Sequence, residues 1–564
     1  MRTTASPLAV LLGMAMALAL APFVACGSRV PLDPGTAPGG RSGTSALPDA
    51  SGAAGASATT SVSGAGAAGS TQGAAGADAR DASTTTSALD AAGADARDAS
   101  PTAYGVDAGG ADIKTSDAAG ESMGAAGTCA AAAAGAVGTT AVGDVAPGDP
   151  SLLPLTAASL APCPCAPGGT VEVITCGVPE QSLSGRDAPD AVVTRDGATV
   201  AVNRCDPDAS NTCANGVYLW TKATGTMKLA GSAFAFALSA DGTTLLAERN
   251  PGNDAHVLLW RSGTAFDLLF FRAAFDHGLS ADGNVVVSQY SPTGTEDGSV
   301  AALWSAATGL VTLGDLPGGA VYSEPAALSP NASAIVGYGN SARGQEPFLW
   351  TAACGMIDLG VSPDSPANGD VQSYATAISD DGTTVVGGEN ATGTIFRWNA
   401  AQGHRDIGRL FPNDSVHPFF FVWGPRLYVS ADGATVTGTT VGADATMPLA
   451  PAAFRWTSAN GLQALSAAPS IVRGMSADGT RVLGSVVSSD ATDGIGIGAT
   501  ITHAPFISDA HGQHDLATLL TARGAVLTGV TLGDPIALSA DGTTVVGHAT
   551  CGGSEIVYRA TIAP

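Results

Sequence analysis

Residues 539–547 read Ser-Ala-Asp-Gly-Thr-Thr-Val-Val-Gly, and variants of this phrase return throughout the C-terminal two-thirds of the chain. Successive copies lie about 40–60 residues apart, which is typical of a repeat architecture. Asp-Gly between two apolar runs predicts a tight hairpin turn, because both residues tolerate the positive φ that such a turn requires. The turns fall at Asp196-Gly197, Asp241-Gly242, Asp282-Gly283, Asp381-Gly382, Asp432-Gly433, Asp478-Gly479 and Asp541-Gly542, and Pro330-Asn331 is a degenerate copy.

Each turn is followed by sequence for further short strands. A β-branched run such as Thr384-Val385-Val386 comes first, and an aromatic strand follows after a variable loop. A short strand such as 355–360 ends the unit. Four short strands in a unit of this length are typical of a propeller blade, whose sheets cover one another's faces. The copies therefore predict an all-β fold over residues 166–564, an eight-bladed β-propeller. The aromatic strands end at Trp220, Trp260, Trp304, Trp350, Trp398 and Trp456.

The last unit ends one strand short of a full blade. A strand without a blade is predicted at 170–175, just before the first complete unit. We expect this N-terminal strand to complete the eighth blade and close the ring, which protects edges that would otherwise template aggregation. In that arrangement Cys176 ends the outer strand close to where Cys551 precedes the neighbouring strand, so a disulfide between them is predicted.

Residues 1–25 resemble a bacterial lipoprotein signal peptide. Arg2 precedes an apolar run from Leu8 to Leu20, and small or apolar residues lead to Cys26. The run is too short to favour a permanent membrane span. We expect cleavage before Cys26 and lipidation of that cysteine, which in the lipoprotein family carries lipid on both its sulfur and its amino group and so anchors the protein stably. The alternative is an ordinary secretory signal with a cysteine near its cleavage site.

Residues 26–165 are dominated by Ala, Gly, Ser, Thr and Asp, and one decamer occurs identically at 74–83 and 91–100. Burial of such side chains cannot offset the entropy lost on ordering the chain. We therefore expect a disordered tether that holds the propeller away from the membrane.

The charge of the chain limits its partners. The net charge is -25, and no run of Lys or Arg interleaved with aromatic residues occurs. Phosphate neutralisation, the main source of affinity for nucleic acids, therefore has no source here. We expect no nucleic-acid partner and contact with a membrane only through the lipid anchor. The predicted location is the bacterial cell envelope, facing outward.

Nine cysteines are present, and setting Cys26 aside leaves an even number, which fits an oxidising compartment. Cys205 and Cys213 bracket a short acidic loop and are predicted to form a disulfide. A structural bridge is favoured at residues 163–165 over a redox pair or a metal site. The pairing is left open for Cys129, Cys163, Cys165 and Cys354.

A family resemblance accompanies the repeats. Residues 309–398 carry it best, in the segments Leu313-Gly314-Asp315-Leu316-Pro317-Gly318-Gly319, Val336-Gly337, Phe348-Leu349-Trp350, Ala375-Thr376-Ala377-Ile378-Ser379, Val385-Val386-Gly387 and Trp398. These segments resemble the extracellular HAF repeat. The resemblance extends over about 186–564 in graded quality and implies an extracellular, β-rich repeat domain with no established activity.

Aromatic residues gather in two connections between predicted blades, 266–275 and 411–423. Aromatic rings there would suit stacking on a sugar or a peptide, with histidines as polar companions. The alternative is that these residues pack between blades as part of the core. The candidate binding face consists of Phe271, His277, His417, Phe420 and Trp423.

No familiar catalytic motif occurs, and we expect neither a cofactor nor a metal ion. His511 and His514 are interpreted as a surface pair. The leading function is a surface-exposed binding or scaffolding lipoprotein for an extracellular glycan, peptide or protein. One alternative is an extracellular carbohydrate-active enzyme with carboxylates from several blades, and another is a structural component of the envelope.

Overall fold

A computed structural model describes the protein over residues 146–147, 156–158, 163–165, 167–176, 191–207, 213–229, 233–249, 256–261, 264–268, 271, 278–292, 298–365, 371–389, 393–408, 410, 427–442, 450–489 and 501–562. Strands make up nearly all of its regular structure, and α2 (Leu516–Ala522) is the one helix in these ranges. The structure thus confirms the predicted β-rich fold, because the regular structure of the described residues is almost entirely strand. None of the described helices is long and apolar enough to span a membrane.

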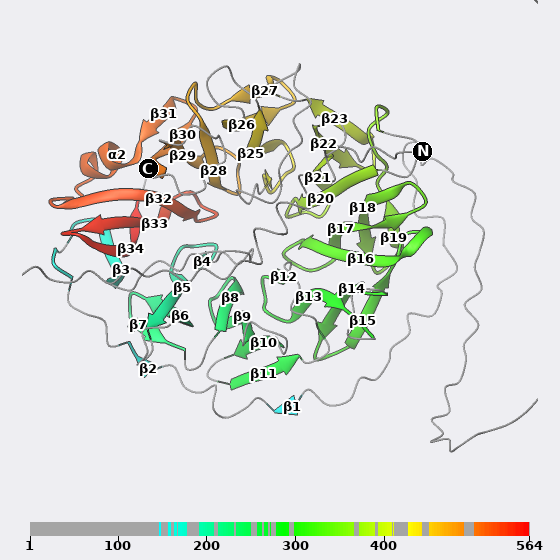
Figure 1. The fold of residues 1–564 in the computed structure, drawn as a ribbon, viewed down its shortest axis with the longest axis horizontal. Coiled ribbons are helices and arrows are strands. Elements are labelled where there is room, and N and C mark those ends of the chain that lie inside the picture. Colours follow the sequence, from blue (N-terminus) through cyan, green and yellow to red (C-terminus); the bar gives the residue numbers. More distant parts are fainter. Residues whose placement is uncertain are drawn as a thin grey trace, which may run out of the picture. The chain divides into compact units, whose positions relative to one another are not determined.

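The strands form antiparallel units of four, which we number in chain order (Figure 1). Unit 1 contains β4 (Ala191–Val193), β5 (Thr199–Pro207), β6 (Cys213–Thr221) and β7 (Gly225–Lys228). Unit 2 contains β8 (Ala233–Leu238), β9 (Thr244–Arg249), β10 (His256–Arg261) and β11 (Thr264–Leu268). Unit 3 contains β12 (Gly278–Leu279), β13 (Val285–Tyr290), β14 (Val300–Ser305) and β15 (Gly309–Gly314). Unit 4 contains β16 (Gly318–Leu328), β17 (Ala334–Ser341), β18 (Gly344–Thr351) and β19 (Gly355–Asp358).

The second half of the fold repeats this pattern. Unit 5 contains β20 (Val371–Ile378), β21 (Thr384–Glu389), β22 (Thr394–Asn399) and β23 (Gly403–Gly408). Unit 6 contains β24 (Tyr428–Val429), β25 (Thr435–Gly442), β26 (Ala450–Thr457) and β27 (Gly461–Ala464). Unit 7 contains β28 (Ser470–Met475), β29 (Val482–Ser489), β30 (Ile501–Asp509) and β31 (Gly512–Asp515). Units 4 and 5 share one sheet, because β18 and β20 pair in parallel over two residues each.

Unit 8 joins the two ends of the folded region. It contains β32 (Val530–Leu538), β33 (Thr544–Cys551), β34 (Ser554–Thr561) and the early strand β3 (Val171–Cys176). β3 pairs antiparallel with β34, and Figure 1 shows the cyan strand beside the red one. The N-terminal strand therefore completes the sheet of the last unit, as the sequence predicts.

The disulfides at this junction differ from the prediction. Cys176 does not bond to Cys551; it pairs with Cys163, and Cys551 pairs with Cys165. The Cys-Pro-Cys segment lies between the two strand ends, so each strand cysteine reaches a partner on that segment instead of on the other strand. Two structural bridges thus hold residues 163–165 against unit 8.

Two short strands lie inside the stretch that composition assigns to the tether. β1 (Ala146–Pro147) pairs with β11, and β2 (Thr156–Ala157) pairs with β7. Each adds a fifth strand to the outer edge of a unit. Backbone pairing at an exposed sheet edge needs no apolar side chains, so composition alone gives no sign of it.

The repeated turn is longer than the two-residue hairpin expected from Asp-Gly. In unit 2 the Gly242 N–H donates to the Ser239 carbonyl at 2.9 Å, which closes a four-residue β-turn. The Ser239 hydroxyl donates to Asp241 at 2.6 Å and accepts from the Thr244 N–H at 2.9 Å. Gly242 has a φ of +69°, but among the described non-glycine residues only Ala332 has a positive φ. The prediction of positive φ at the aspartates was wrong, because the serine side chain and the glycine make the reversal.

Apolar residues follow each turn at a fixed distance and form the core. The fourth residue after the turn's Asp or Asn is apolar in every unit and at most 1% exposed. These residues are Val200, Leu245, Val286, Ile335, Val385, Val436, Val482 and Val545. The apolar core between neighbouring units therefore lies close to the end of the strands that carries the turns.

Each turn also packs against the preceding unit. A Cβ placed on Gly242 would lie 2.6 Å from Thr199 Oγ1 of unit 1, so only glycine fits there. Alanines before the aspartates donate N–H bonds to the next turn, as Ala240 does to the Ala281 carbonyl at 2.7 Å. Arginines on the third strands donate to the next turn's glycine carbonyl, as Arg397 does to Gly433 at 3.1 Å.

Unit 8 contacts unit 1 through the same three interactions. A Cβ on Gly197 would lie 2.6 Å from Thr544, and the Ala540 N–H donates to the Arg195 carbonyl at 2.8 Å. Arg559 donates to the Gly197 carbonyl at 2.7 Å and lies over the Trp220 ring at 5.6 Å. The contacts between the last unit and the first are thus those of consecutive units.

The degenerate turn of unit 4 provides a test of this geometry. Ala332 occupies the glycine position with a φ of 53°, which costs an L-residue about 1 kcal/mol. We expect Ala332→Gly to raise the free energy of unfolding by about 0.5–1 kcal/mol, measured by denaturant titration. The same change at the exposed Ala434, which has a negative φ, should lower it instead. Equal effects at both positions would contradict the turn geometry.

The two disulfides should contribute unequally to stability. Cys165 and Cys551 are 386 residues apart, whereas Cys163 and Cys176 are 13 apart. Closing the longer loop removes more entropy from the unfolded chain. We expect the double variant Cys165→Ala, Cys551→Ala to lose about 2–4 kcal/mol, and Cys163→Ala, Cys176→Ala to lose less. Peptide mapping that finds a bond between Cys176 and Cys551 would overturn the pairing.

Candidate functional site

Polar residues replace the apolar core at the end of the strands away from the turns. Seven residues after the turn's Asp or Asn, seven of the units carry a polar side chain and unit 5 carries Gly388. These polar residues are Asn203, Glu248, Gln289, Tyr338, Thr439, Ser485 and His548. Most of them are buried, and buried polar groups in apolar surroundings are costly unless they have partners. At the turn-distal end, buried polar side chains therefore take the place of apolar ones.

A buried carboxylate lies at the centre of one polar group at this end. Glu324 of β16 is 6% exposed. Its Oε2 accepts hydrogen bonds from the hydroxyls of Tyr322 and Tyr338, the latter at 2.7 Å. Tyr374 of β20 meets Tyr338 edge to face, with ring centroids 4.7 Å apart and planes at 89°. We call Glu324, Tyr322, Tyr338 and Tyr374, together with the adjoining Asp315 and Gln289, the tyrosine–carboxylate cluster.

Asp315 and Gln289 are the remaining polar members of the cluster. Asp315 Oδ2 accepts from the Tyr322 N–H at 3.1 Å, while its buried Oδ1 has no hydrogen-bond partner. Gln289 of β13 is 4% exposed. Its side-chain amide interacts with the Tyr322 phenol oxygen, which lowers the pKa of Tyr322, while the Tyr322 hydroxyl donates to Glu324. Tyr322 thus connects both residues to Glu324.

Burial raises the pKa values of several side chains in the cluster. Burial raises the pKa of Asp315 to about 6, although the Tyr322 N–H bond opposes the shift. Burial and then the charge of Glu324 raise the pKa of Tyr374 to about 12, and the same two causes raise that of Tyr322 further. Within the described ranges no Lys, Arg or His forms an ion pair with Glu324 or Asp315. The cluster is therefore an uncompensated acidic site lined by aromatic rings.

A second polar group lies on units 7 and 8. Asp534 of β32 pairs with Arg473 of β28, and its Oδ1 lies 3.4 Å from His503 Nδ1. Ser485 Oγ lies 3.3 Å from the same nitrogen. A catalytic triad places serine and carboxylate on opposite nitrogens of the ring, so this Ser-His-Asp group lacks the geometry for nucleophilic catalysis.

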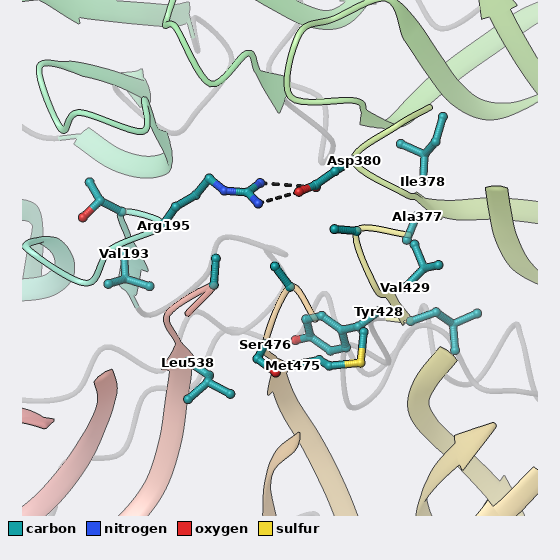
Figure 2. A pocket seen from close by; sticks show the side chains of 15 residues that line it. Val193, Arg195, Ala377, Ile378, Asp380, Tyr428, Val429, Met475, Ser476 and Leu538 are labelled. Atoms are coloured by element: carbon teal, nitrogen blue, oxygen red, sulfur yellow. Dashed lines mark hydrogen bonds and ion pairs between the residues drawn. The ribbon is translucent and has the colours of Figure 1, made fainter. Parts of the chain in front are cut away.

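A cavity of about 320 Å³ lies at the opposite end of the strands, beside the turns (Figure 2). Apolar residues that end the first strands line it, among them Val193, Ile378 and Leu538. Arg195 of unit 1 crosses toward unit 5 and donates to Asp380 Oδ1 at 3.2 Å, with a second, shorter contact between the same groups. Among the described residues that line this cavity, Asp380 is the one carboxylate, and it is paired with Arg195.

The predicted binding face is only partly covered by the structure. Phe271 is 2% exposed and packs with Leu268 and Trp304, so it belongs to the core and presents no surface to a ligand. For this residue the alternative of packing between units holds. The other four residues, His277, His417, Phe420 and Trp423, lie outside the described residues.

Several other predicted residues have a defined position. The side chains of Cys205 and Cys213 and all of Cys26 lie outside the described part of the chain, so these assignments stay predictions. His511 lies in the turn between β30 and β31, and His514 lies on β31, where its Nε2 is 3.1 Å from Asp509 Oδ1. No group of three His, Cys, Asp or Glu residues in the described part is arranged to hold a metal ion. Sequence reasoning missed the tyrosine–carboxylate cluster, although polar residues recurring seven positions after each turn would have indicated that end.

Comparison with known proteins adds little. No family model matches the chain, and no curated protein does. The chain is similar to the β-propeller domain of the Trilobed protease from Pyrococcus furiosus, with 10% identity over 58% of this chain and 94% of that one and a TM-score of 0.35. An oligogalacturonate lyase from Vibrio parahaemolyticus is 11% identical over 70% of this chain and 98% of that one, with a TM-score of 0.36. An acylaminoacyl peptidase from Pyrococcus horikoshii is 11% identical over 58% of this chain and 52% of that one, with a TM-score of 0.35. At these TM-scores the likenesses carry no conclusion about function.

The raised pKa of Asp315 predicts a pH dependence of stability. Its folded value of about 6 exceeds the unfolded value of about 4, so the folded state binds this proton more tightly. The contribution of Asp315 to the free energy of unfolding then falls as the pH rises from about 4 to about 6. Asp315→Asn keeps an acceptor for the Tyr322 N–H but does not titrate. We expect it to raise the Tm at pH 7 and to leave it nearly unchanged at pH 4.

Thermal unfolding between pH 4 and 7 checks this expectation. The control is Asp364→Asn, which removes an exposed carboxylate and should leave the wild-type pH dependence in place. A lower Tm for Asp315→Asn at pH 7 would show that the charged carboxylate stabilises the fold, contrary to the expectation.

Proposed function

We propose that this protein is an exported, lipid-anchored binding protein, and that its four-stranded units are the eight blades of a closed β-propeller built from HAF-type repeats. Closure is supported by the contacts between units 8 and 1, which repeat those between consecutive units. The pairing of β3 with β34 supplies the fourth strand of the last blade. A closed ring leaves no inner face of a sheet exposed.

Export and anchoring are supported by the N-terminal sequence and by the disulfides. The apolar run ends at Cys26, the residue that would carry the lipid. The bridges from Cys163 to Cys176 and from Cys165 to Cys551 require an oxidising compartment, as outside the bacterial cytoplasm. The segment between Cys26 and residue 165 would then separate the propeller from the membrane.

The turn-distal end of the blades is the proposed binding face. The observation that carries this proposal is the tyrosine–carboxylate cluster, in which Glu324 is buried and bonded by tyrosine hydroxyls without a basic partner among the described residues. A buried charge of this kind lowers the stability of the fold, so stability does not account for it. Binding sites are where such a cost is offset by a ligand. An extracellular glycan, peptide or protein is the proposed class of ligand.

A carbohydrate-active enzyme is the second candidate, and one observation favours it. Asp315, with its pKa near 6, and Glu324 both contact Tyr322, the former through its N–H and the latter through its hydroxyl. A pair of neighbouring carboxylates is the usual catalytic equipment for glycoside hydrolysis. Release of reducing ends from any bound glycan would favour this candidate over pure binding.

The binding function is tested with the full chain carrying Cys26→Ser, which leaves the protein soluble. Glycan and peptide arrays identify a ligand, and calorimetry measures its Kd for Glu324→Gln and for Asp380→Asn. We expect Glu324→Gln to weaken binding at least about tenfold, which corresponds to about 1.4 kcal/mol. Asp380→Asn alters a carboxylate at the turn end and should leave the Kd unchanged.

Two results would overturn the proposal. One is that no glycan or peptide on the arrays binds. The other is that Asp380→Asn abolishes binding while Glu324→Gln does not, because the ligand would then occupy the cavity beside the turns. A Tm for each variant, measured alongside, distinguishes lost contacts from lost folding.

A further inference from the structure

Cys354 belongs to a disulfide, and its partner is not among the cysteines whose side chains the structure describes. Cys354 lies in the hairpin turn between β18 and β19 and is disulfide-bonded. The other four cysteines with described side chains form the two bridges at unit 8. The candidates for its partner are the remaining four, Cys26, Cys129, Cys205 and Cys213.

The hairpin turn itself does not need a sulfur atom. Its hydrogen bonds run from the Cys354 N–H to the hydroxyl and the carbonyl of Thr351, at 3.2 and 3.3 Å. Equivalent N–H bonds to the side chain three residues earlier form in units 1, 3 and 5, where this position holds Thr224, Thr308 and Gln402. The cysteine is therefore an addition to the repeat, and its bond serves something other than the turn.

The position of Cys354 in the fold narrows the choice. Cys205 and Cys213 lie on β5 and β6 at the turn-distal end of unit 1, whereas the hairpin of Cys354 lies at the turn end of unit 4. Units 2 and 3 lie between these two in the row of contacting units. Cys26 is the proposed site of lipidation, and a lipidated sulfur forms no disulfide. Cys129 is the cysteine that remains.

The described parts of the N-terminal segment follow three consecutive units. Residues 163–165 are bridged to unit 8, β2 pairs with the outer strand of unit 1, and β1 pairs with the outer strand of unit 2 (Figure 1). Thr156 precedes Cys163 by seven residues, and Ala146 precedes Thr156 by ten. Because the reach of an extended chain is proportional to its length, two further steps of this size lead past unit 3 to unit 4 about 14–20 residues before Ala146. Cys129 lies 17 residues before Ala146.

Side-chain contacts add to the backbone pairing of this segment. Ala158, next to β2, packs against apolar core residues of units 1 and 8. Leu, Ile and Val occur seven times in the 102 residues 27–128, and they also occur seven times in the 37 residues 129–165. Lys and Arg occur five times in the first range and not at all in the second. A segment that packs on a protein surface has apolar side chains to bury, so the change at Cys129 fits the start of such packing.

We propose that Cys129 forms a disulfide with Cys354, and that residues 129–165 form a belt along the outer edges of units 4, 3, 2 and 1. Each thiol loses one proton and one electron as the sulfur–sulfur bond forms. The disulfide of an extracytoplasmic thiol–disulfide oxidoreductase accepts both protons and both electrons and becomes a dithiol. The belt goes beyond the proposed function, because it concerns how the propeller is attached and not what it binds.

The belt determines where the lipid-anchored chain leaves the propeller. The tether expected from composition would comprise residues 27–128 only, and it would end at the hairpin of Cys354 in unit 4. Tension on an anchor at Cys26 would then pull on a covalent bond. It would not reach β3, whose pairing with β34 completes unit 8. The disulfide would thus protect the junction between the two ends of the folded region.

Peptide mapping of the oxidised full chain carrying Cys26→Ser tests the bond. Cleavage before aspartates places Cys129 in residues 117–143 and Cys354 in residues 315–357, each apart from every other cysteine. We expect mass spectrometry to find these two peptides linked without reductant and separate after reduction. A free thiol at Cys354, or a link from its peptide to any other peptide, would overturn the proposal.

Limited digestion of the same protein with elastase, which cleaves after small residues, tests the belt. We expect cleavage within residues 27–128 and protection of residues 129–145. Cys354→Thr installs the residue that units 1 and 3 have at this position and keeps the turn, and it should raise the rate of cleavage within 129–145 at least about tenfold. Cys129→Ser should do the same. Gln402→Thr, at the same hairpin position in unit 5, is the matched control and should leave the rate unchanged.

Two digestion results would overturn the belt. One is that residues 129–145 of the parent protein are cleaved as fast as residues 27–128. The other is that the rate within 129–145 is the same in the parent protein and in Cys129→Ser. A Tm for each variant shows whether the propeller stays folded. If Cys354→Thr lowers the Tm to the temperature of the assay, Cys129→Ser decides the outcome, because its change lies outside the repeat units.

Discussion

The contact between each turn's glycine and the first residues of the preceding unit's second strand governs the rest of the structure. Gly242 lies so close to Thr199 that no side chain fits between them, and Gly197 is equally close to Thr544. The approach is possible because the serine and aspartate side chains satisfy the turn's own backbone, as in the bonds of Ser239 with Asp241 and Thr244. Neighbouring units are thus set at one spacing, and the apolar residues that follow the turns meet between them.

This arrangement makes the two ends of the strands different in kind. Beside the turns, apolar side chains such as Val200 and Val545 are fully buried, and the turns bond directly to one another. At the other end, polar residues such as Glu324 and Gln289 take the buried positions. The turn end therefore supplies the stability that allows unsatisfied polar atoms to persist at the distal end. This division of roles is the physical basis for placing a ligand there.

The two polar groups described at the distal end differ in whether a carboxylate has a basic partner. Asp534 has Arg473 as a partner, and His503 and Ser485 complete a mutually bonded group. Glu324 has only tyrosine hydroxyls, and Asp315 keeps one oxygen unpaired. The first group is explained as a link between units 7 and 8. The second is not explained by the packing of units 3, 4 and 5, which is why it is the stronger candidate for recognition.

The sequence by itself determined the repeat, the turns, the strands that follow them and the return of the N-terminal strand to the last unit, because these depend on residues close together in the chain or on a strand left without a partner. It did not determine the disulfide partners: Cys176 ends β3 and Cys551 ends β33, on either side of β34, and each pairs with a cysteine of the segment that carries Cys163 and Cys165. Nor did it find the tyrosine–carboxylate cluster, whose members come from three units. Only the tertiary structure decides which polar residues of different units meet, since that depends on how the units pack and not on any local pattern.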